Sequence, residues 1–421
     1  MDSIKNIIII IIFIKLIQIY SQIIIPFKNN LNFSSLTSEN FISQLSNLNI
    51  TTNIALGSPL IEIPFNIKLS SYHMICLSYN SNKGKIFPSF NEENSSSFSS
   101  KDKNAQFYHL YDTEFCRRSN DNFKINNIQI KNISFFLSYD LERNQSGVLG
   151  LKLSDSFSEY NFINQLKMNN LILSQTMFFK FKNFIEGEII IGNYPHEINK
   201  NIYDENNFQK TQVPISSLNQ EYSIIINKVQ YGEQIIVEEQ EFIFNLNSFF
   251  TLVNLDLLRI MKEKFLNELL ENKKCEEKIK KTSIYEAFYY VCEKEINIKN
   301  IENIKFISND LKYEFIFKPK DLFIQENDKI FFTIYFMDYW QKKWIFGYHF
   351  LTKFQIIFNQ DKKTIGFYNK INEIKFPISL LISIVFAIII IILIFYIFHL
   401  LKKKRKIRAN ELVENFEYIS Q

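Results

Sequence analysis

Four cysteines are the residues of this 421-residue chain whose spacing most directly suggests chemistry. They stand at Cys76, Cys116, Cys275 and Cys292, and in an oxidising compartment four cysteines can form two disulfides in three connectivities. Proximity along the chain favours one pair in each half, the first two together and the last two together. A zinc site would need ligand pairs at short spacing such as CxxC, and the five histidines show no ligand spacing. The sequence therefore predicts two disulfides, no metal and no cofactor.

Residues 1–21 have the composition of a secretory signal peptide. Lys5 precedes an apolar run, and Tyr20-Ser21-Gln22 supplies a weak cleavage site. An uncleaved N-terminal anchor is the alternative, because Lys15 interrupts the apolar run. Under both interpretations the chain enters the secretory pathway.

A second apolar segment, residues 376–401, predicts a transmembrane helix. It has no charged residue, and at ~1.5 Å per residue it can cross a hydrocarbon core of ~30 Å. A buried core helix is a poorer explanation, because core helices of this length usually keep a polar face. The basic cluster Lys402–Arg408 places the tail, residues 402–421, in the cytoplasm. The expected topology is single-pass type I, with the ectodomain in the lumen or outside the cell.

The part between these segments is long enough to bury two cores. Its expected organisation is a short pre-domain segment, residues 22–52, followed by two lobes at residues 53–200 and 201–375. The formal net charge of +4 is largely due to the basic cluster, so we expect no nucleic-acid binding. Sequons that predict N-glycosylation all stand in the first half, at Asn32, Asn49, Asn94, Asn132 and Asn144.

Strand signals dominate this central part and predict an all-β ectodomain. The expected strands are short, rich in β-branched or aromatic residues and bounded by polar or glycine positions. Helices are few: Leu255–Leu270 has one apolar face, and a shorter helix is expected over Tyr160–Lys167. The expected strands are Ile54–Leu56, Ile61–Leu69, Ile125–Phe136, Phe178–Phe181, Glu188–Ile191, Tyr222–Val229, Ile235–Phe244, Tyr313–Phe317, Ile330–Phe336 and Phe354–Phe358.

Several short motifs follow one another along the ectodomain. Of the nine glycines, all except Gly84 and Gly232 stand in these motifs, where a positive φ or a close backbone approach is expected. The motifs are IALGSP at Ile54–Pro59, SGVLGL at Ser146–Leu151, FINQL at Phe162–Leu166, GEIIIG at Gly187–Gly192, WIFGYHFL at Trp344–Leu351 and TIGF at Thr364–Phe367.

The ordered set resembles the pepsin-like aspartic protease family from about residue 53 to residue 368. The resemblance implies an all-β, bilobal, pepsin-like ectodomain. An unrelated β-sandwich with chance matches is the alternative, but such a chain would scatter its glycines. In the family two aspartates, one per lobe, share a proton and bind one water, which attacks the peptide bond.

The resemblance puts both catalytic positions on residues that are not acids. Counted from Gly57 at the family's spacing, the first position falls on Lys68. A shift of one or two residues offers Asn66, Ile67 or Leu69, and the nearest acid on that strand is Glu62. The second falls on Asn245, just before the helix at Leu255. We therefore expect both aspartates to be replaced. Because a protonated lysine and an amide supply no base, we expect the site to be catalytically inactive. Lys68 could act as a base only if burial lowered its pKa, and nothing else in the sequence supports a lysine mechanism.

The flap that covers the cleft in this family corresponds to Tyr108–Cys116, with Tyr111 as its candidate tyrosine. No glycine occurs between Gly84 and Gly147, so the tip of this hairpin is expected to differ. The sequence therefore predicts a monomeric, membrane-displayed and catalytically inactive ectodomain that binds a peptide or protein, or serves as an adhesion or receptor surface. The alternative is an active membrane-bound aspartic endopeptidase with non-standard catalytic residues.

Overall fold

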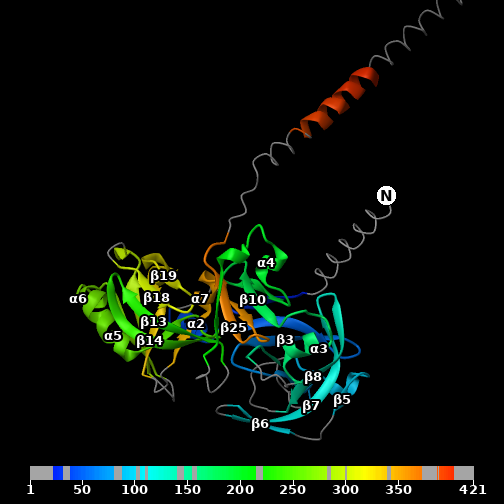
Figure 1. The fold of residues 1–421 in the computed structure, drawn as a ribbon, viewed down its shortest axis with the longest axis horizontal. Helices are drawn as coiled ribbons and strands as arrows, with labels where there is room; N and C mark the ends of the chain where they lie inside the picture. Colours follow the sequence, from blue (N-terminus) through cyan, green and yellow to red (C-terminus); the bar gives the residue numbers. More distant parts are fainter. Residues whose placement is uncertain are drawn as a thin grey trace, which may run out of the picture. The chain divides into compact units, whose positions relative to one another are not determined.

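The computed structural model describes residues 22–31, 38–79, 88–100, 105–109, 112–139, 147–153, 159–214, 221–281, 286–298, 301–338, 343–371, 386 and 388–402. The chain divides into two compact units, Met1–Lys370 and Ile371–Gln421. The first unit consists mainly of two large β-sheets, which confirms the predicted fold class (Figure 1).

The first sheet contains 14 strands within the described residues. Side chains alternate between its faces, and in β1 the residues Ile23, Ile25 and Phe27 are buried while those between them are exposed. The strands are β1 (Ile23–Asn29), β2 (Ile50–Leu56), β3 (Ile61–Lys68), β4 (Met74–Leu77), β5 (Ser99–Ser100), β6 (Ala105–His109), β7 (Asp112–Ile125), β8 (Ile128–Ser138), β9 (Gly147–Gly150), β10 (Thr176–Phe181), β11 (Glu186–Ile191), β12 (Phe208–Gln212), β24 (Ile357–Asn359) and β25 (Thr364–Tyr368).

The second sheet contains 11 strands in the described part of the chain. Its core is aromatic: Phe242 stacks on Phe346 with ring centroids 4.0 Å apart, and Phe346 stacks on Phe350 at 3.7 Å. The strands are β13 (Ser223–Tyr231), β14 (Gln234–Phe244), β15 (Thr251–Asn254), β16 (Cys275–Lys281), β17 (Glu286–Glu293), β18 (Ile304–Ser308), β19 (Tyr313–Phe317), β20 (Phe323–Glu326), β21 (Lys329–Phe332), β22 (Ile334–Met337) and β23 (Trp344–Phe346).

One arrangement of four strands occurs in both sheets. In the first sheet, β9 pairs in parallel with β3 and antiparallel with β4, and β4 pairs in parallel with β8. In the second, β23 pairs in parallel with β14 and antiparallel with β15, and β15 pairs in parallel with β22. The turn after β3 and the turn after β14 are therefore equivalent positions of one repeated topology.

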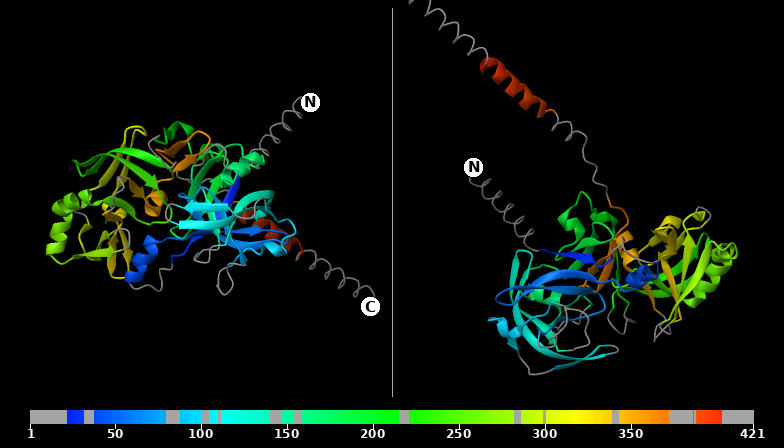
Figure 2. Two further views of the ribbon diagram at one scale, coloured as in Figure 1. Left: turned by 90° about the horizontal axis from the view of Figure 1, so that it is seen from below. Right: turned by 180° about the vertical axis from the view of Figure 1, so that it is seen from behind.

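Two segments connect the sheets. The last strands, β24 and β25, return to the first sheet, where β24 pairs with β10 and β25 with β12. In the opposite direction, the early helix α2 (Ser38–Ser46) packs against the second sheet, and the ring centroids of Phe41 and Phe331 lie 5.1 Å apart (Figure 2). The expected pre-domain segment, residues 22–52, thus contains a strand and a helix that contact both sheets.

The other helices lie on the edges and faces of the sheets. The helix expected over Leu255–Leu270 is present, with a π-helical turn at Lys262–Leu266 between α5 and α6. The helices are α3 (Phe162–Met168), α4 (Pro195–Ile198), α5 (Leu255–Met261), α6 (Asn267–Glu271) and α7 (Tyr348–Lys353).

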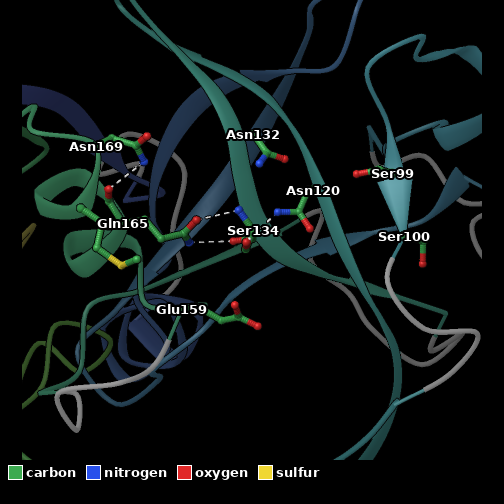
Figure 3. A pocket seen from close by; sticks show the side chains of 9 residues that line it. Ser99, Ser100, Asn120, Asn132, Ser134, Glu159, Gln165 and Asn169 are labelled. Atoms are coloured by element: carbon green, nitrogen blue, oxygen red, sulfur yellow. Dashed lines mark hydrogen bonds between the residues drawn. The ribbon is translucent and has the colours of Figure 1, made fainter.

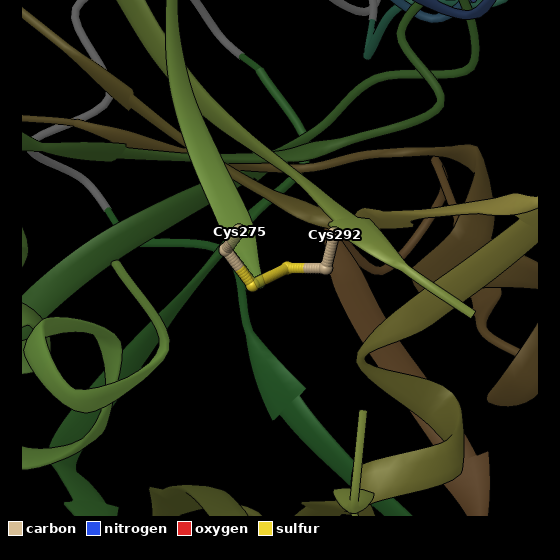
Figure 4. Close-up of a disulfide and its surroundings, with 2 residues drawn as sticks. All are labelled: Cys275 and Cys292. Atoms are coloured by element: carbon tan, nitrogen blue, oxygen red, sulfur yellow. A yellow bond between two sulfur atoms is a disulfide. The ribbon is translucent and has the colours of Figure 1, made fainter. Parts of the chain in front are cut away.

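The disulfide between Cys275 and Cys292 is confirmed (Figure 4). It joins directly opposite residues of β16 and β17, and both side chains are buried. The predicted Cys76–Cys116 disulfide is not formed in the described structure. Both of these cysteines flank β8, but Cys76 packs in the main core, whereas Cys116 packs with Ile75 on the opposite face of the sheet. Successive strand residues point to opposite faces, so proximity in sequence did not bring these two sulfurs together.

Replacing Cys275 with alanine is expected to lower the free energy of unfolding by about 3 kcal/mol, because the bond closes a loop with a sequence separation of 17 residues. The double variant Cys275→Ala/Cys292→Ala should lose about the same amount, since either change removes the cross-link. Urea unfolding of the purified protein measures both. A single variant that unfolds at the wild-type urea concentration would show that the cross-link does not stabilise the fold.

In the second unit, residues 388–402 form a helix with exposed side chains. Within the described ranges, no helix combines the length and apolar character needed to span a membrane. The predicted signal peptide, residues 1–21, lies outside the described residues, as do residues 372–385 and 387 of the region around the predicted transmembrane segment.

Candidate functional site

The two equivalent turns carry the positions at which the sequence suggested catalytic residues. Lys68 is the last residue of β3 and pairs with Gly150 of β9. Asn245 follows β14, and its N–H donates to the carbonyl oxygen of Phe346 (3.0 Å), one residue before Gly347. Register therefore makes Lys68 and Asn245 equivalent residues of the two sheets.

A glycine presses against each turn. A Cβ atom on Gly150 would lie 2.4 Å from the carbonyl oxygen of His73, and a Cβ atom on Gly347 would lie 2.2 Å from that of Phe250. Real Cβ atoms do not approach backbone this closely, so only glycine fits at either place. This close approach fixes the turn geometry in both sheets.

The turn after β14 is closed by an amide side chain. Asn245 Oδ1 accepts the N–H of Asn247 (2.8 Å), as short polar side chains often do in turns. Lys68, at the other turn, is half-buried. Among the described residues, the hydrogen bonds of Asn245, Asn247 and Asn66 end on amides or backbone groups and never on a carboxylate. A neutral amide cannot take a proton from water.

Four asparagines form a continuous hydrogen-bonded series between the two sheets. Asn66 Nδ2 donates to Asn49 Oδ1 (2.9 Å), and Asn247 Nδ2 donates to Asn66 Oδ1 (3.3 Å). Asn247 N–H then donates to Asn245 Oδ1 (2.8 Å). Asn66 is 4% exposed, and its amide nitrogen and oxygen are both paired within the series; the other three asparagines are partly exposed. We call Asn49, Asn66, Asn245 and Asn247 the asparagine series.

The segment between α2 and β2 lies directly on the turn after β14. Leu48 N–H donates to the Asn247 carbonyl (3.0 Å), and Asn247 Nδ2 donates to the Leu48 carbonyl (3.1 Å). Phe249 N–H donates to the Leu45 carbonyl (2.9 Å). Leu45 and Leu48 are buried, so this contact is both polar and apolar. The Asn247 carbonyl and the Phe249 N–H of this turn are thus already paired within the chain.

Sequence reasoning missed a buried lysine beside the first turn. Lys152 is 3% exposed, its N–H donates to the Ser71 carbonyl (2.9 Å), and its Nζ lies 4.4 Å from the centroid of the Tyr72 ring. Burial lowers the pKa of Lys152, the nearby Glu221 raises it, and Lys343 lowers it further. The available cue was the place of this lysine inside the apolar run LGLKL.

The remaining predicted site residues are spread over the first sheet or lie outside the described residues. Tyr111, the flap candidate, and the sequon residues Asn32 and Asn144 are outside the described residues. Asn94 and Asn132 are exposed. Asn49 belongs to the asparagine series, in which its Oδ1 accepts from Asn66; a glycan on its Nδ2 would leave that oxygen in place, so this sequon stays a prediction. Among the described residues, no group of three or more His, Cys, Asp or Glu side chains could hold a metal ion.

A protein-family model matches most of the chain. The family model described as eukaryotic aspartyl protease matches residues 66–370, which is more than two thirds of the chain. The match begins inside β3, so β1, α2 and β2 lie before it. No curated protein matches the sequence.

Proposed function

This chain belongs to the eukaryotic aspartyl protease family, and from that premise we propose that it is a member that does not cleave peptides. Its ectodomain acts instead as a membrane-displayed surface that binds a peptide or protein. The observation that carries the proposal is the asparagine series. Hydrolysis in this family needs two acids that share a proton between the lobes, whereas the equivalent positions hold Lys68 and Asn245 and the series that joins the two sheets consists of amides, which supply neither the charge nor the base.

The segment Leu45–Asn49 covers the turn after β14, so we expect a bound peptide or protein to contact another part of the ectodomain. A peptide that approached this turn would have to displace Leu48 from Asn247 and Leu45 from Phe249. Each of these backbone hydrogen bonds contributes about 1 kcal/mol, and the buried leucines add to that. The partner surface therefore lies outside this turn.

Membrane display is supported by the order of segments after the ectodomain. The matched family range ends at residue 370, and the uncharged stretch 376–401 begins six residues later. The basic cluster Lys402–Arg408 then follows, which is the arrangement of a stop-transfer segment. We therefore expect the ectodomain to lie in the lumen or outside the cell.

We expect the purified full-length protein in detergent to leave a peptide library intact from acid to neutral pH. An active aspartic protease serves as the positive control, and mass spectrometry detects products. The variant Lys68→Ala is the matched control, because cleavage by a contaminating host protease would persist in it unchanged. Cleavage by the wild type that a statine-type inhibitor blocks and that Lys68→Ala alters would sink the proposal.

The rival function, an active endopeptidase with unusual residues, needs two carboxylates within hydrogen-bond distance between the lobes. The hydrogen bonds of the asparagine series offer amides and backbone groups instead. No observation on the described residues favours this rival.

A further inference from the structure

A polar groove of about 500 Å³ lies on the first sheet (Figure 3), and none of its lining residues belongs to the asparagine series. It is formed by β5, β7, β8 and the end of α3, and almost all of its side chains carry hydroxyl, amide or carboxylate groups. We call it the Asn120 groove. Its lining residues are Ser99, Ser100, Asn120, Asn132, Ser134, Glu159, Gln165, Met168 and Asn169.

The floor of the Asn120 groove is held rigidly. Gln165 Oε1 accepts the Ser134 N–H (2.6 Å), and Gln165 Nε2 donates to the Ser134 carbonyl (2.8 Å), which fastens α3 to β8. Asn169 Nδ2 donates to the Gln165 carbonyl (2.9 Å). These amides are therefore positioned before any ligand arrives, and the ordering of side chains on binding is small.

One buried acceptor in this floor lacks a partner. Asn120 is 5% exposed, and its Nδ2 donates to Ser134 Oγ (2.7 Å). Its Oδ1 is buried and has no hydrogen-bond partner. Buried polar atoms in native proteins are nearly always paired, so this oxygen indicates a donor from a bound polar group.

Asn132 stands on the rim of the same groove and is the first residue of a sequon. Pairing between β7 and β8 shifts register at Asp121 and Phe123, and Asn132 lies in this bulge with a φ of 57°. Its side chain is exposed, whereas Ser134, the third residue of the sequon, is only 7% exposed. The Asn132 amide, to which a glycan would be attached, is thus at the mouth of the groove, and the Ser134 hydroxyl of the sequon is at its floor.

We propose that Asn132 carries an N-linked glycan and that the first sugar of this glycan, an N-acetylhexosamine, lies in the Asn120 groove. In the modification, the Asn132 amide nitrogen attacks the anomeric carbon of a lipid pyrophosphate-linked oligosaccharide. A C–N bond forms, the C–O bond to pyrophosphate breaks, the lipid pyrophosphate leaves, and the amide nitrogen loses one proton. The proposal requires the lumenal placement given above but not the absence of proteolysis.

The chemistry of the groove fits a sugar better than a peptide or an ion. The hydroxyl and acetamido groups of a sugar donate and accept neutral hydrogen bonds. The groove is lined by amide and serine side chains that can do the same, and Glu159 is the single carboxylate among its lining residues. Its volume lies within the range of small-molecule sites. The hydroxyl of Ser134 is bound by Asn120, so the glycan must be added before this part of the chain folds.

The test is native deglycosylation of the full-length protein made in secreting eukaryotic cells. Asn94 is the internal reference, because it is an exposed sequon residue outside the groove. Glycopeptide mass spectrometry should find both Asn132 and Asn94 occupied. A peptide N-glycosidase should release the Asn132 glycan about tenfold more slowly than the Asn94 glycan from native protein, equivalent to one or two hydrogen bonds. After denaturation the two rates should be equal.

Two variants test whether the groove causes the slower release of the Asn132 glycan. Asn120→Ala removes the unpartnered acceptor, and Asn169→Ala changes an exposed residue of the rim without touching Ser134. Both should bring the Asn132 release rate toward that of Asn94 and leave the Asn94 rate unchanged. An occupied Asn94 with an empty Asn132, or equal native rates at the two sites, overturns the proposal. Empty sites at both positions overturn it together with the lumenal placement, while the result of the peptide-library assay is unaffected.

Discussion

Replacing Gly347 with alanine is expected to prevent stable folding of the second sheet, with a loss of more than ~4 kcal/mol in the free energy of unfolding. The added Cβ would lie 2.2 Å from the carbonyl oxygen of Phe250 and 2.6 Å from that of Ser248, and neither backbone group can move without opening the turn after β14. Denaturant unfolding and the yield of secreted protein measure the effect. Gly150→Ala should be equally harmful, because Gly150 holds the equivalent place in the first sheet.

Gly232→Ala is the matched control for these two variants. Gly232 has a φ of 60° in the turn between β13 and β14, and its nearest neighbours are side-chain atoms of Glu302 at 3.3 Å or more. We expect a loss of only about 1 kcal/mol from the left-handed backbone conformation. If Gly347→Ala is no worse than Gly232→Ala, close packing of glycine against the turn does not determine its geometry.

Replacing Phe41 with alanine should lower the free energy of unfolding by about 3–5 kcal/mol. Phe41 is fully buried, and its ring lies against Phe331 of β21, so the change leaves a cavity between α2 and the second sheet. Urea unfolding of the purified protein gives the loss. The result would show that α2, which lies before the matched family range, is an integral part of the fold.

Ser43→Ala provides the comparison on the same helix. Ser43 is exposed, and alanine has a higher helix propensity, so this variant should be as stable as the wild type or slightly more stable. If the Phe41→Ala and Ser43→Ala proteins unfold at the same urea concentration, α2 is not docked on the second sheet in solution.

Local pattern predicted much of the strand content but blurred some boundaries. The expected strand Ile61–Leu69 corresponds closely to β3, and the expected helix Leu255–Leu270 to α5 and α6. The expected strand Ile125–Phe136 instead spans the end of β7, a turn at Asn126 and Asn127, and most of β8. Asn126 adopts a φ of 52°, and an Asn-Asn turn between two apolar runs gives a weaker signal than one that contains glycine.

Long-range pairing was beyond the reach of sequence pattern. Periodicity says which face of β24 and β25 is apolar, but it does not say that, besides pairing with each other, β24 pairs with β10 and β25 with β12 of the first sheet. The same limit hid α2, because a nine-residue amphipathic segment between two apolar stretches gives no indication of the sheet on which it packs.

The candidate site was predictable in its residue types but not in its connections. Spacing from Gly57 led to Lys68, and the position just before the expected helix at Leu255 led to Asn245; register makes these two residues equivalent. The direct hydrogen bond from Asn247 to Asn66, and the bond from Asn66 to Asn49, could not be predicted from a chain so rich in asparagine, since each amide looks like any other in sequence. The burial of Lys152 depends on tertiary packing, and its position in the apolar run LGLKL was only a weak sequence signal.

The return of β25 to the first sheet decides how mechanical load travels through the molecule. Tension applied at Lys370 enters β25, whose register with β12 runs from Phe208 opposite Tyr368 to Gln212 opposite Thr364. From there it passes through β24 to β10 and on to β11 and β1. The second sheet is a side branch of this path, so a tether pulling on the chain would shear the first sheet while the second carried little force.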